Sequence, residues 1–229
     1  MYITCEEAKS FALGEMEKLF LKVPFTREFH AGIAINEDYY ARHLLETVLR
    51  IRLNNEVDAY CLHKIDHTNN LLAVKLAQYL AEELGHENFF KNDLKYFSIN
   101  ENQIDDTRVF FATEKLIGYM YYCINNDGPL ITMVWNWFVE LYSDIFNAKI
   151  TRKAAIEFGK THTVGFEHHI GIDDELDHVG LMYSTVELAV KSQKDADLVK
   201  YYLTNLIDLL GDYFQELYDE TIGKEKLLA

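Results

Sequence analysis

The scarcity of helix-breaking residues is the feature that most limits the folds open to this chain. Its 229 residues include only 2 prolines, Pro24 and Pro129, and 11 glycines. So few breakers favour long helices and disfavour a sandwich of many short strands, which needs frequent turns. Hydrophobic residues make up 49% of the chain, so a sizeable core can form around such helices.

Capping signals and periodic apolar residues predict where the helices lie. Thr4 followed by two glutamates predicts a helix start, and the apolar spacing from Tyr40 to Leu53 fits a long helix. We expect a loop from Pro24 to Asn36. One helix should start at Thr68 or Asn69, run to about Gly85 and continue or restart through Phe97. The other expected helices cover residues 5–21, 37–64, 102–125, 130–147, 151–170, 177–192 and 196–221. The sequence therefore predicts one all-α domain over residues 1–229 with seven or eight helices.

Charge and cysteine content exclude several classes of partner. The formal net charge is -15 and no cluster of lysines or arginines offsets it, so binding to nucleic acid or to an anionic membrane is not expected. No apolar run approaches the roughly 18 residues that cross a bilayer, and the first residues do not resemble a signal peptide. The separated cysteines Cys5, Cys61 and Cys123 argue against a disulfide framework. We expect a cytoplasmic protein.

A carboxylate and an imidazole lie close together near the end of the third expected helix. Glu83 and His86 are three residues apart, and Glu82 and His86 are four apart, so either glutamate shares a helix face with the imidazole. Di-iron bundles place a glutamate and a histidine inward at this spacing. A surface pair near a helix end has the same pattern, and the sequence leaves both interpretations open.

Further nitrogen and oxygen donors are concentrated between His168 and His178. Three histidines and four acids occur within these eleven residues, and His169 with Asp173, like Asp174 with His178, is spaced four apart. Apolar residues among them indicate that one face is buried, where carboxylates need a partner such as a metal ion. The alternative is a solvated acidic helix end.

Glu140 is a single acid in the very apolar segment from Met133 to Leu141, and it is either exposed on a polar face or a buried ligand. Together the three segments offer histidines and carboxylates and no thiolate, which favours iron or manganese over a structural zinc site. Two metal ions need about six such ligands, and these segments can supply them.

The first of these segments resembles a motif of the haem-oxygenase-like di-iron oxidases, relatives of the TenA thiaminase and PqqC quinone-synthase folds. The run from Glu82 to His86 is similar to the family's E-E-x-G-H, and Asp93-Leu94 is similar to the D-L pair that follows it. The resemblance covers roughly residues 40–190 and implies a single haem-oxygenase-like helical bundle.

Later segments extend the resemblance with one departure. Glu140 matches the helix in which one glutamate bridges the metals, and His169 with an aspartate four residues later matches the start of an H-x3-D-x2-H motif. The family's last histidine falls where this chain has Leu176, and His178 lies two residues further on. A π-bulge or a helix break near Gly171 would realign His169 with His178.

The resemblance implies oxygen activation by two Fe(II) ions, with manganese also compatible. The ligands that it assigns are Glu83, His86, Glu140, His169 and His178, with Asp173 or Asp174 as a further carboxylate and Glu46 as an additional ligand or pocket acid. Members of the family oxidise amines, split C–C bonds of fatty acids or amino acids, or modify their own side chains, and one forms a nitrile from a halogenated tryptophan.

An aromatic amino acid is the small-molecule substrate that this resemblance favours, with a fatty-acid-cleaving oxidase as the alternative. Its ring would pack against aromatic walls, and its carboxylate would bind an arginine or lysine such as Arg50, Arg52 or Lys75. Homodimers are usual in this family, and the resemblance implies a homodimer here.

Three other functions use different residues. A metal-independent, TenA-like hydrolase would use Cys123 as nucleophile, although no base or cation is identifiable nearby. A haem oxygenase would need His30 or His43 as the haem ligand. In a non-catalytic binding module the acidic clusters would be solvated faces.

Overall fold

The computed structural model describes the backbone of residues 2–224 and, within them, every side chain except those of residues 172–176. All regular structure in this part of the chain is helical, as predicted. In chain order the α-helices are α1 (Cys5–Lys22), α2 (Thr26–His30), α3 (Glu37–Lys64), α4 (Asn70–Glu83), α5 (Glu87–Leu94), α6 (Glu101–Asp106), α7 (Phe111–Asp127), α8 (Leu130–Tyr142), α9 (Ala148–Phe158), α10 (Val164–Leu176), α11 (His178–Ala189) and α12 (Gln193–Tyr218).

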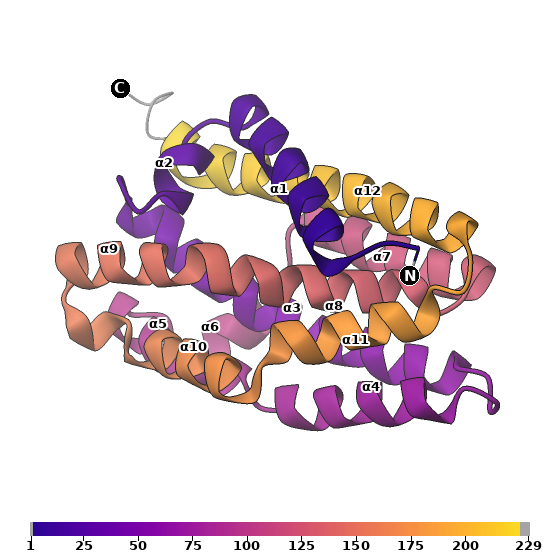
Figure 1. Cartoon of the computed structure of the whole chain (residues 1–229). Helices are drawn as coiled ribbons and strands as arrows, with labels where there is room; N and C mark the ends of the chain where they lie inside the picture. Colours follow the sequence, from indigo (N-terminus) through magenta and orange to yellow (C-terminus); the bar gives the residue numbers. More distant parts are fainter. Residues whose placement is uncertain (1, 225–229) are drawn as a thin grey trace.

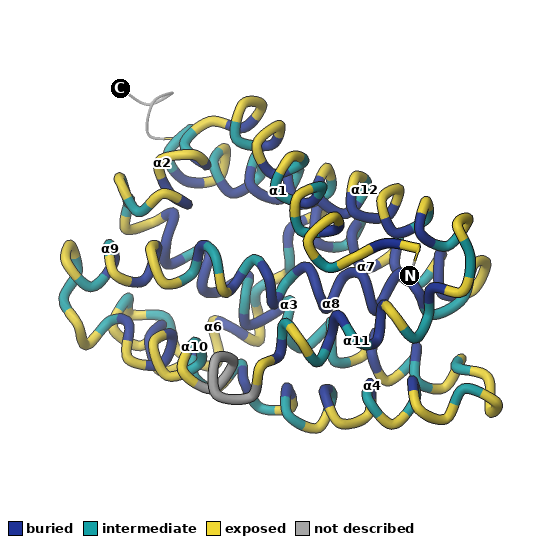
Figure 2. The backbone as a smooth tube through the Cα atoms, in the orientation of Figure 1, coloured by how far each residue is buried: buried dark blue, intermediate teal, exposed yellow. Residues whose placement is uncertain are grey.

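Helix α8 is the centre of the bundle. Every residue from Leu130 to Phe138 is buried, which suits a helix that is apolar on all sides and covered on all sides. It packs against α3, α7, α11 and α12. In Figure 1, α1 and α12 lie above this central layer and α4, α10 and α11 lie below it, and Figure 2 shows the buried backbone of α8 between them. In the part of the chain that the structure describes, no helix is both long and apolar enough to cross a bilayer.

Local capping signals fix the ends of two predicted helices. The Thr4 side chain accepts the N–H of Glu7 at 3.2 Å, while the Glu7 side chain accepts the N–H of Thr4 at 2.8 Å, so a capping box starts α1. Asn36 accepts the N–H of Tyr39 at 3.0 Å at the start of α3. The bounds of α3, Glu37–Lys64, are those predicted.

Other predicted helices are interrupted. The expected helix over 102–125 is wrong in its first part, because α6 ends at Asp106 and α7 begins at Phe111. The expected helix over 151–170 is divided by Gly159, whose φ of 101° is incompatible with a helix. The short helix α2 forms within the stretch expected to be a loop. The expected helix that begins at residue 130 passes through a π-helical turn after α8 and continues as α9.

The two helices that carry the late histidines meet at Asp177. Its φ of 50° and ψ of 51° are left-handed, which ends α10, and its side chain accepts the N–H of Gly180 at 3.1 Å, which caps α11. The predicted break near Gly171 is therefore wrong in position, because Gly171 lies inside α10. The chain changes direction directly before His178 instead.

Glu46, predicted as an additional ligand or pocket acid, has a structural role. Its fully buried carboxylate lies 2.7 Å from Nη1 of Arg42 and accepts the N–H of Phe110 at 3.0 Å and the hydroxyl of Thr113 at 2.5 Å. Phe110 and Thr113 lie at the start of α7, so Glu46 caps that helix from α3. The prediction of a ligand at Glu46 is corrected, because these contacts occupy its oxygens.

Replacing Glu46 by alanine is expected to lower the free energy of unfolding by about 3 kcal/mol, because Arg42 loses its buried partner and Phe110 and Thr113 lose their acceptor. Glu216 still accepts the N–H groups of Phe111 and Ala112 at the start of α7. Urea unfolding followed by circular dichroism measures the change. Glu46→Gln is the control, since it keeps a hydrogen-bond acceptor and removes only the charge. A loss of less than about 1 kcal/mol in Glu46→Ala, the range of surface pairs, would contradict this role.

Candidate metal centre

Five of the residues predicted as ligands lie together in the interior. Glu83, His86 and His169 place one potential ligand atom each within 4.8 Å of one another, and so do Glu83, Glu140 and His178. Glu83 belongs to both groups, so two ions held there would share its carboxylate. The resemblance gave the bridging position to Glu140, whereas the residue shared by the two groups is Glu83.

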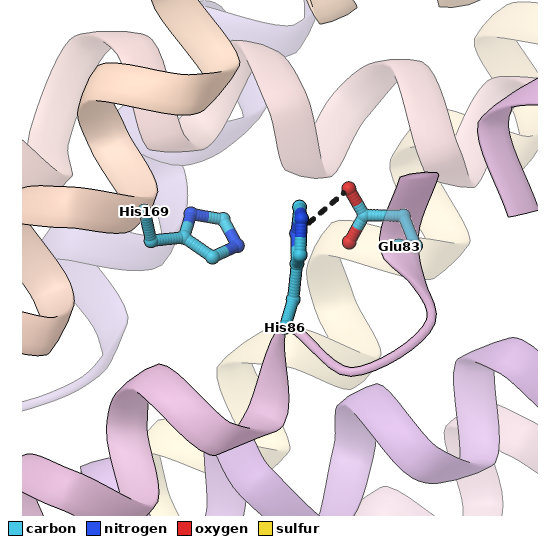
Figure 3. A group of neighbouring side chains, drawn as sticks. All are labelled: Glu83, His86 and His169. Carbon is cyan, nitrogen blue, oxygen red and sulfur yellow. Dashed lines mark ion pairs between the residues drawn. The ribbon is translucent and has the colours of Figure 1, made fainter. Parts of the chain in front are cut away.

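The first group forms at the corner between α4 and α5. Helix α4 ends at Glu83, Gly85 takes a φ of 97°, and His86 directly precedes α5. Left-handed backbone of this kind is easily adopted only by glycine. The corner turns the imidazole back, so that Nδ1 of His86 lies 3.2 Å from Oε1 of Glu83 (Figure 3). The pair therefore meets across a turn and does not share a continuous helix face.

His169 reaches this group from α10, which is docked closely on α5. A Cβ added at Gly165 would lie 2.0 Å from the carbonyl oxygen of Phe89, so the approach requires glycine. The carboxylate of Asp93, the aspartate of the D-L pair, accepts the N–H of Gly165 and that of the next residue, both at 2.8 Å. The His169 ring then lies 4.8 Å from the His86 ring, centroid to centroid, and faces it from another helix (Figure 3).

His178 joins the second group from the first turn of α11 and is fully buried. Its Nδ1 lies 3.5 Å from Oε1 of Glu83 and 3.7 Å from Oε2 of Glu140. Its Nε2 lies 3.2 Å from Oε2 of Glu82. Metal-binding histidines commonly have such a carboxylate behind the ring. Glu82, which the sequence pairs with His86, thus contacts His178.

The sequence did not single out three buried residues beside these groups. The hydroxyl of Tyr79 donates to Oε1 of Glu140 at 2.6 Å, and the amide of Asn136 donates to Oδ1 of Asp58 at 2.8 Å. Tyr79 lies one helical turn before Glu83, and Asn136 lies one turn before Glu140, so both share the face of a predicted ligand. Asp58 lies on α3 and has no such signal.

Burial among acidic neighbours changes the protonation of this region. Burial raises the pKa of Asp58 to about 8, the hydrogen bond from Asn136 opposes that rise, and the charges of Glu83 and Glu140 add to it. Burial also raises the pKa of Tyr79, again with a contribution from Glu140. A cation bound among these carboxylates would relieve their mutual repulsion.

A cavity opens beside the two groups. One wall comes from a single face of α3 and includes His43, Arg50, Asn54 and Asp58. The cavity reaches three of the predicted ligands, namely Glu83, Glu140 and His169, and much of the remaining wall is aromatic, from Phe90, Trp135, Phe138, Phe166 and Phe214. A small organic molecule in this cavity would contact both the potential metal ligands and an apolar wall.

The donor atoms present fit a pair of metal ions. Oε1 of Glu83 and Nδ1 of His86 are buried and lie 3.2 Å apart, yet neither atom makes a hydrogen bond. Buried polar atoms of this kind are uncommon, and a site for a bound ion is one of their standard explanations. The two groups offer imidazole nitrogens and carboxylate oxygens without a thiolate, a set that suits iron or manganese.

Other candidates from the sequence lie outside this arrangement. The side chains of Asp173 and Asp174 fall outside the described residues, so the choice between them stays a prediction. Cys123 is buried on α7 and does not line the cavity. Burial raises the pKa of its thiol, and the neighbouring hydrogen-bonding group is Tyr119. This environment does not activate a nucleophilic cysteine.

The two histidines considered as haem ligands are hydrogen-bonded inside the aromatic core. Nδ1 of His30 lies 2.6 Å from a backbone carbonyl, and its Nε2 lies 2.7 Å from the hydroxyl of Tyr142. Nδ1 of His43 lies 2.5 Å from the hydroxyl of Tyr213. Burial lowers the pKa of His30 to about 4 and that of His43 as well, so both rings are neutral parts of the packing.

Solved structures show what the backbone is similar to. A domain of unknown function with a haem oxygenase-like fold from Shewanella denitrificans matches 95% of this chain and 93% of its own, with a TM-score of 0.80 and 19% identity. The chain has a haem-oxygenase-like fold. A TenA homologue from Pseudomonas syringae pv. tomato matches 93% of this chain and 92% of its own, with a TM-score of 0.71 and 14% identity. The predicted fold class is confirmed.

A third structure is more distant. A CADD-like protein of unknown function from Nostoc punctiforme matches 94% of this chain and 91% of its own, with a TM-score of 0.56 and 15% identity. No protein-family model matches the sequence, and no curated protein matches it. At these identities the structural likeness establishes the fold alone.

The raised pKa of Asp58 predicts a pH-dependent stability in the metal-free protein. An unfolded aspartate releases its proton near pH 4, whereas folded Asp58 holds it up to about pH 8. The contribution of Asp58 to the free energy of unfolding is therefore fully present below about pH 4 and is lost as the pH rises to about 8. Relative to Asp58→Asn, the wild-type free energy of unfolding should fall between about pH 5 and pH 8. Equal pH dependence of the two proteins in urea unfolding would contradict this.

Proposed function

We propose that this chain is an oxygen-dependent oxidase or oxygenase that holds two iron ions and acts on a small organic substrate. The observation that carries the proposal is the pair of donor groups that share Glu83 and open into an apolar cavity. In such a centre, Glu83 and His86 with His169 would hold one ion, and Glu83 and Glu140 with His178 the other. Two ferrous ions bound there would supply electrons to dioxygen.

The surrounding residues hold the donors in place. The hydrogen bond from Tyr79 fixes Oε1 of Glu140, which leaves Oε2 toward His178. The carboxylate of Glu82 lies 3.2 Å from Nε2 of His178, on the opposite edge of the ring from Nδ1, which lies toward Glu83. The burial of Glu83, Glu140 and His178 excludes bulk water from this region, which protects reactive species and strengthens electrostatic contacts.

The cavity supports an organic acid as the substrate, with an aromatic amino acid as the favoured member. Aromatic walls suit a ring. Of the cations proposed to bind its carboxylate, Arg50 lines the cavity, whereas Arg52 pairs with Asp105 at 2.9 Å. Lys75 is not among the described residues that line it. Oxidation with C–C cleavage to a nitrile is the finer proposal, and cleavage of a fatty acid is the alternative.

The proposed centre predicts that anaerobic titration with ferrous iron reaches about two ions per chain, and that oxygen then produces a transient visible absorption band. His86→Ala should reduce the bound iron to at most one ion per chain and abolish the band, because it removes a nitrogen donor from one group. Iron content is measured by elemental analysis and the band by stopped-flow absorption.

A matched control is available in His67, whose side chain is 92% exposed beside Asp66. His67→Ala should leave both the iron content and the band unchanged. Circular dichroism separates loss of the centre from loss of the fold. Full iron content and an unchanged band in His86→Ala would overturn the assignment, and so would a wild-type protein that binds no iron.

A further inference from the structure

An arginine and an aspartic acid lie apart along the cavity wall that α3 forms. Arg50 and Asp58 line this wall eight residues apart, which at 1.5 Å per residue sets their Cα atoms about 12 Å apart along the helix axis. Helical side chains point toward the helix N-terminus, so the guanidinium of Arg50 extends away from Asp58. The cavity therefore has a cationic end and an acidic end.

Asp58 lies near two residues of the donor groups. Asn136 connects Asp58 to α8 one turn before Glu140, and the charges of Glu83 and Glu140 act on Asp58 directly. In the metal-free protein, an anionic group of a ligand is repelled by the charges of Glu83 and Glu140. The polar head of an organic acid is therefore better placed at the other end of the cavity.

Arg50 lies at that other end without an acidic partner. Its guanidinium lies 5.1 Å from the centre of the Tyr213 ring, and none of the ion pairs among the described residues includes it. By contrast, Arg42 pairs with Glu46 at 2.7 Å, and Arg52 pairs with Asp105 at 2.9 Å. A half-buried guanidinium beside a cavity, with no ion pair to a carboxylate among the described side chains, suits the carboxylate of a ligand.

We infer that Arg50 anchors the carboxylate of an apolar carboxylic acid in this cavity. The apolar body then lies along the aromatic wall, within reach of Glu83 and Glu140. That position of the body rests on the proposed function, whereas the anchoring of the carboxylate does not.

The test measures binding of octanoate to metal-free and iron-loaded protein by isothermal titration calorimetry. Arg50→Gln should weaken octanoate binding by roughly 10- to 100-fold, the range for a lost charge-assisted hydrogen bond. Arg50→Lys should weaken octanoate binding less than Arg50→Gln does, because lysine keeps the positive charge although it lacks the bidentate geometry. Arg52→Gln is the matched control on the same helix and should bind octanoate as the wild type does.

Two further ligands sharpen the test. Octan-1-ol keeps the apolar body without the carboxylate, so its affinity should be equal in wild type and Arg50→Gln. Butanoate should bind more weakly than octanoate by roughly fourfold for each missing methylene, because less apolar surface is buried. Thermal unfolding of each variant shows that the fold is kept.

The outcomes separate this inference from the proposed function. Octanoate binding that needs bound iron and is unchanged in Arg50→Gln and Arg50→Lys would place the carboxylate at the metal ions and overturn the inference. Arg50-dependent octanoate binding in a protein that binds no iron would overturn the proposed function and leave the carboxylate anchor in place. Arg50-dependent binding of equal strength with and without iron supports both.

Discussion

Negative charge buried in an apolar interior is the constraint on which the rest of this structure depends. Asp58, Glu83 and Glu140 lie within the core that the long helices build, and burial raises the pKa of Asp58. His86 and His178 lie beside two of these carboxylates, with ring nitrogens 3.2 to 3.7 Å from oxygens of Glu83 and Glu140. A cation bound here would offset the negative charge of these carboxylates.

The sequence predicts the helical fold because its signals there are local. Asn36 and an unbroken apolar period define α3, and Thr4 defines the start of α1. The interruption at Gly159 could not be predicted, because an isolated glycine is tolerated within many helices. The role of Glu46 was missed for another reason: its partner at the start of α7 is 64 residues away in the chain, and no local pattern reports such a contact.

The candidate centre was predictable as a set of residues but not as an arrangement. Helical spacing drew attention to Glu83 and His86, yet the two meet because Gly85 turns the chain between α4 and α5. The close docking of α10 through Gly165 then brings His169 to the same place. Corners and close approaches position these side chains, and both depend on backbone geometry that residue spacing does not encode. Asp58 was missed because no histidine lies one helical turn from it in the sequence.

The left-handed residue Asp177 has a consequence beyond this chain. It makes a bend between α10 and α11. His178 therefore reaches the interior although it lies two residues later in the sequence than the histidine of the family's motif. A search that demands fixed intervals between histidine and aspartate passes over any relative built in this way. Proteins with the same bend will be recognised by comparing backbones, and their late histidine should be sought immediately after it.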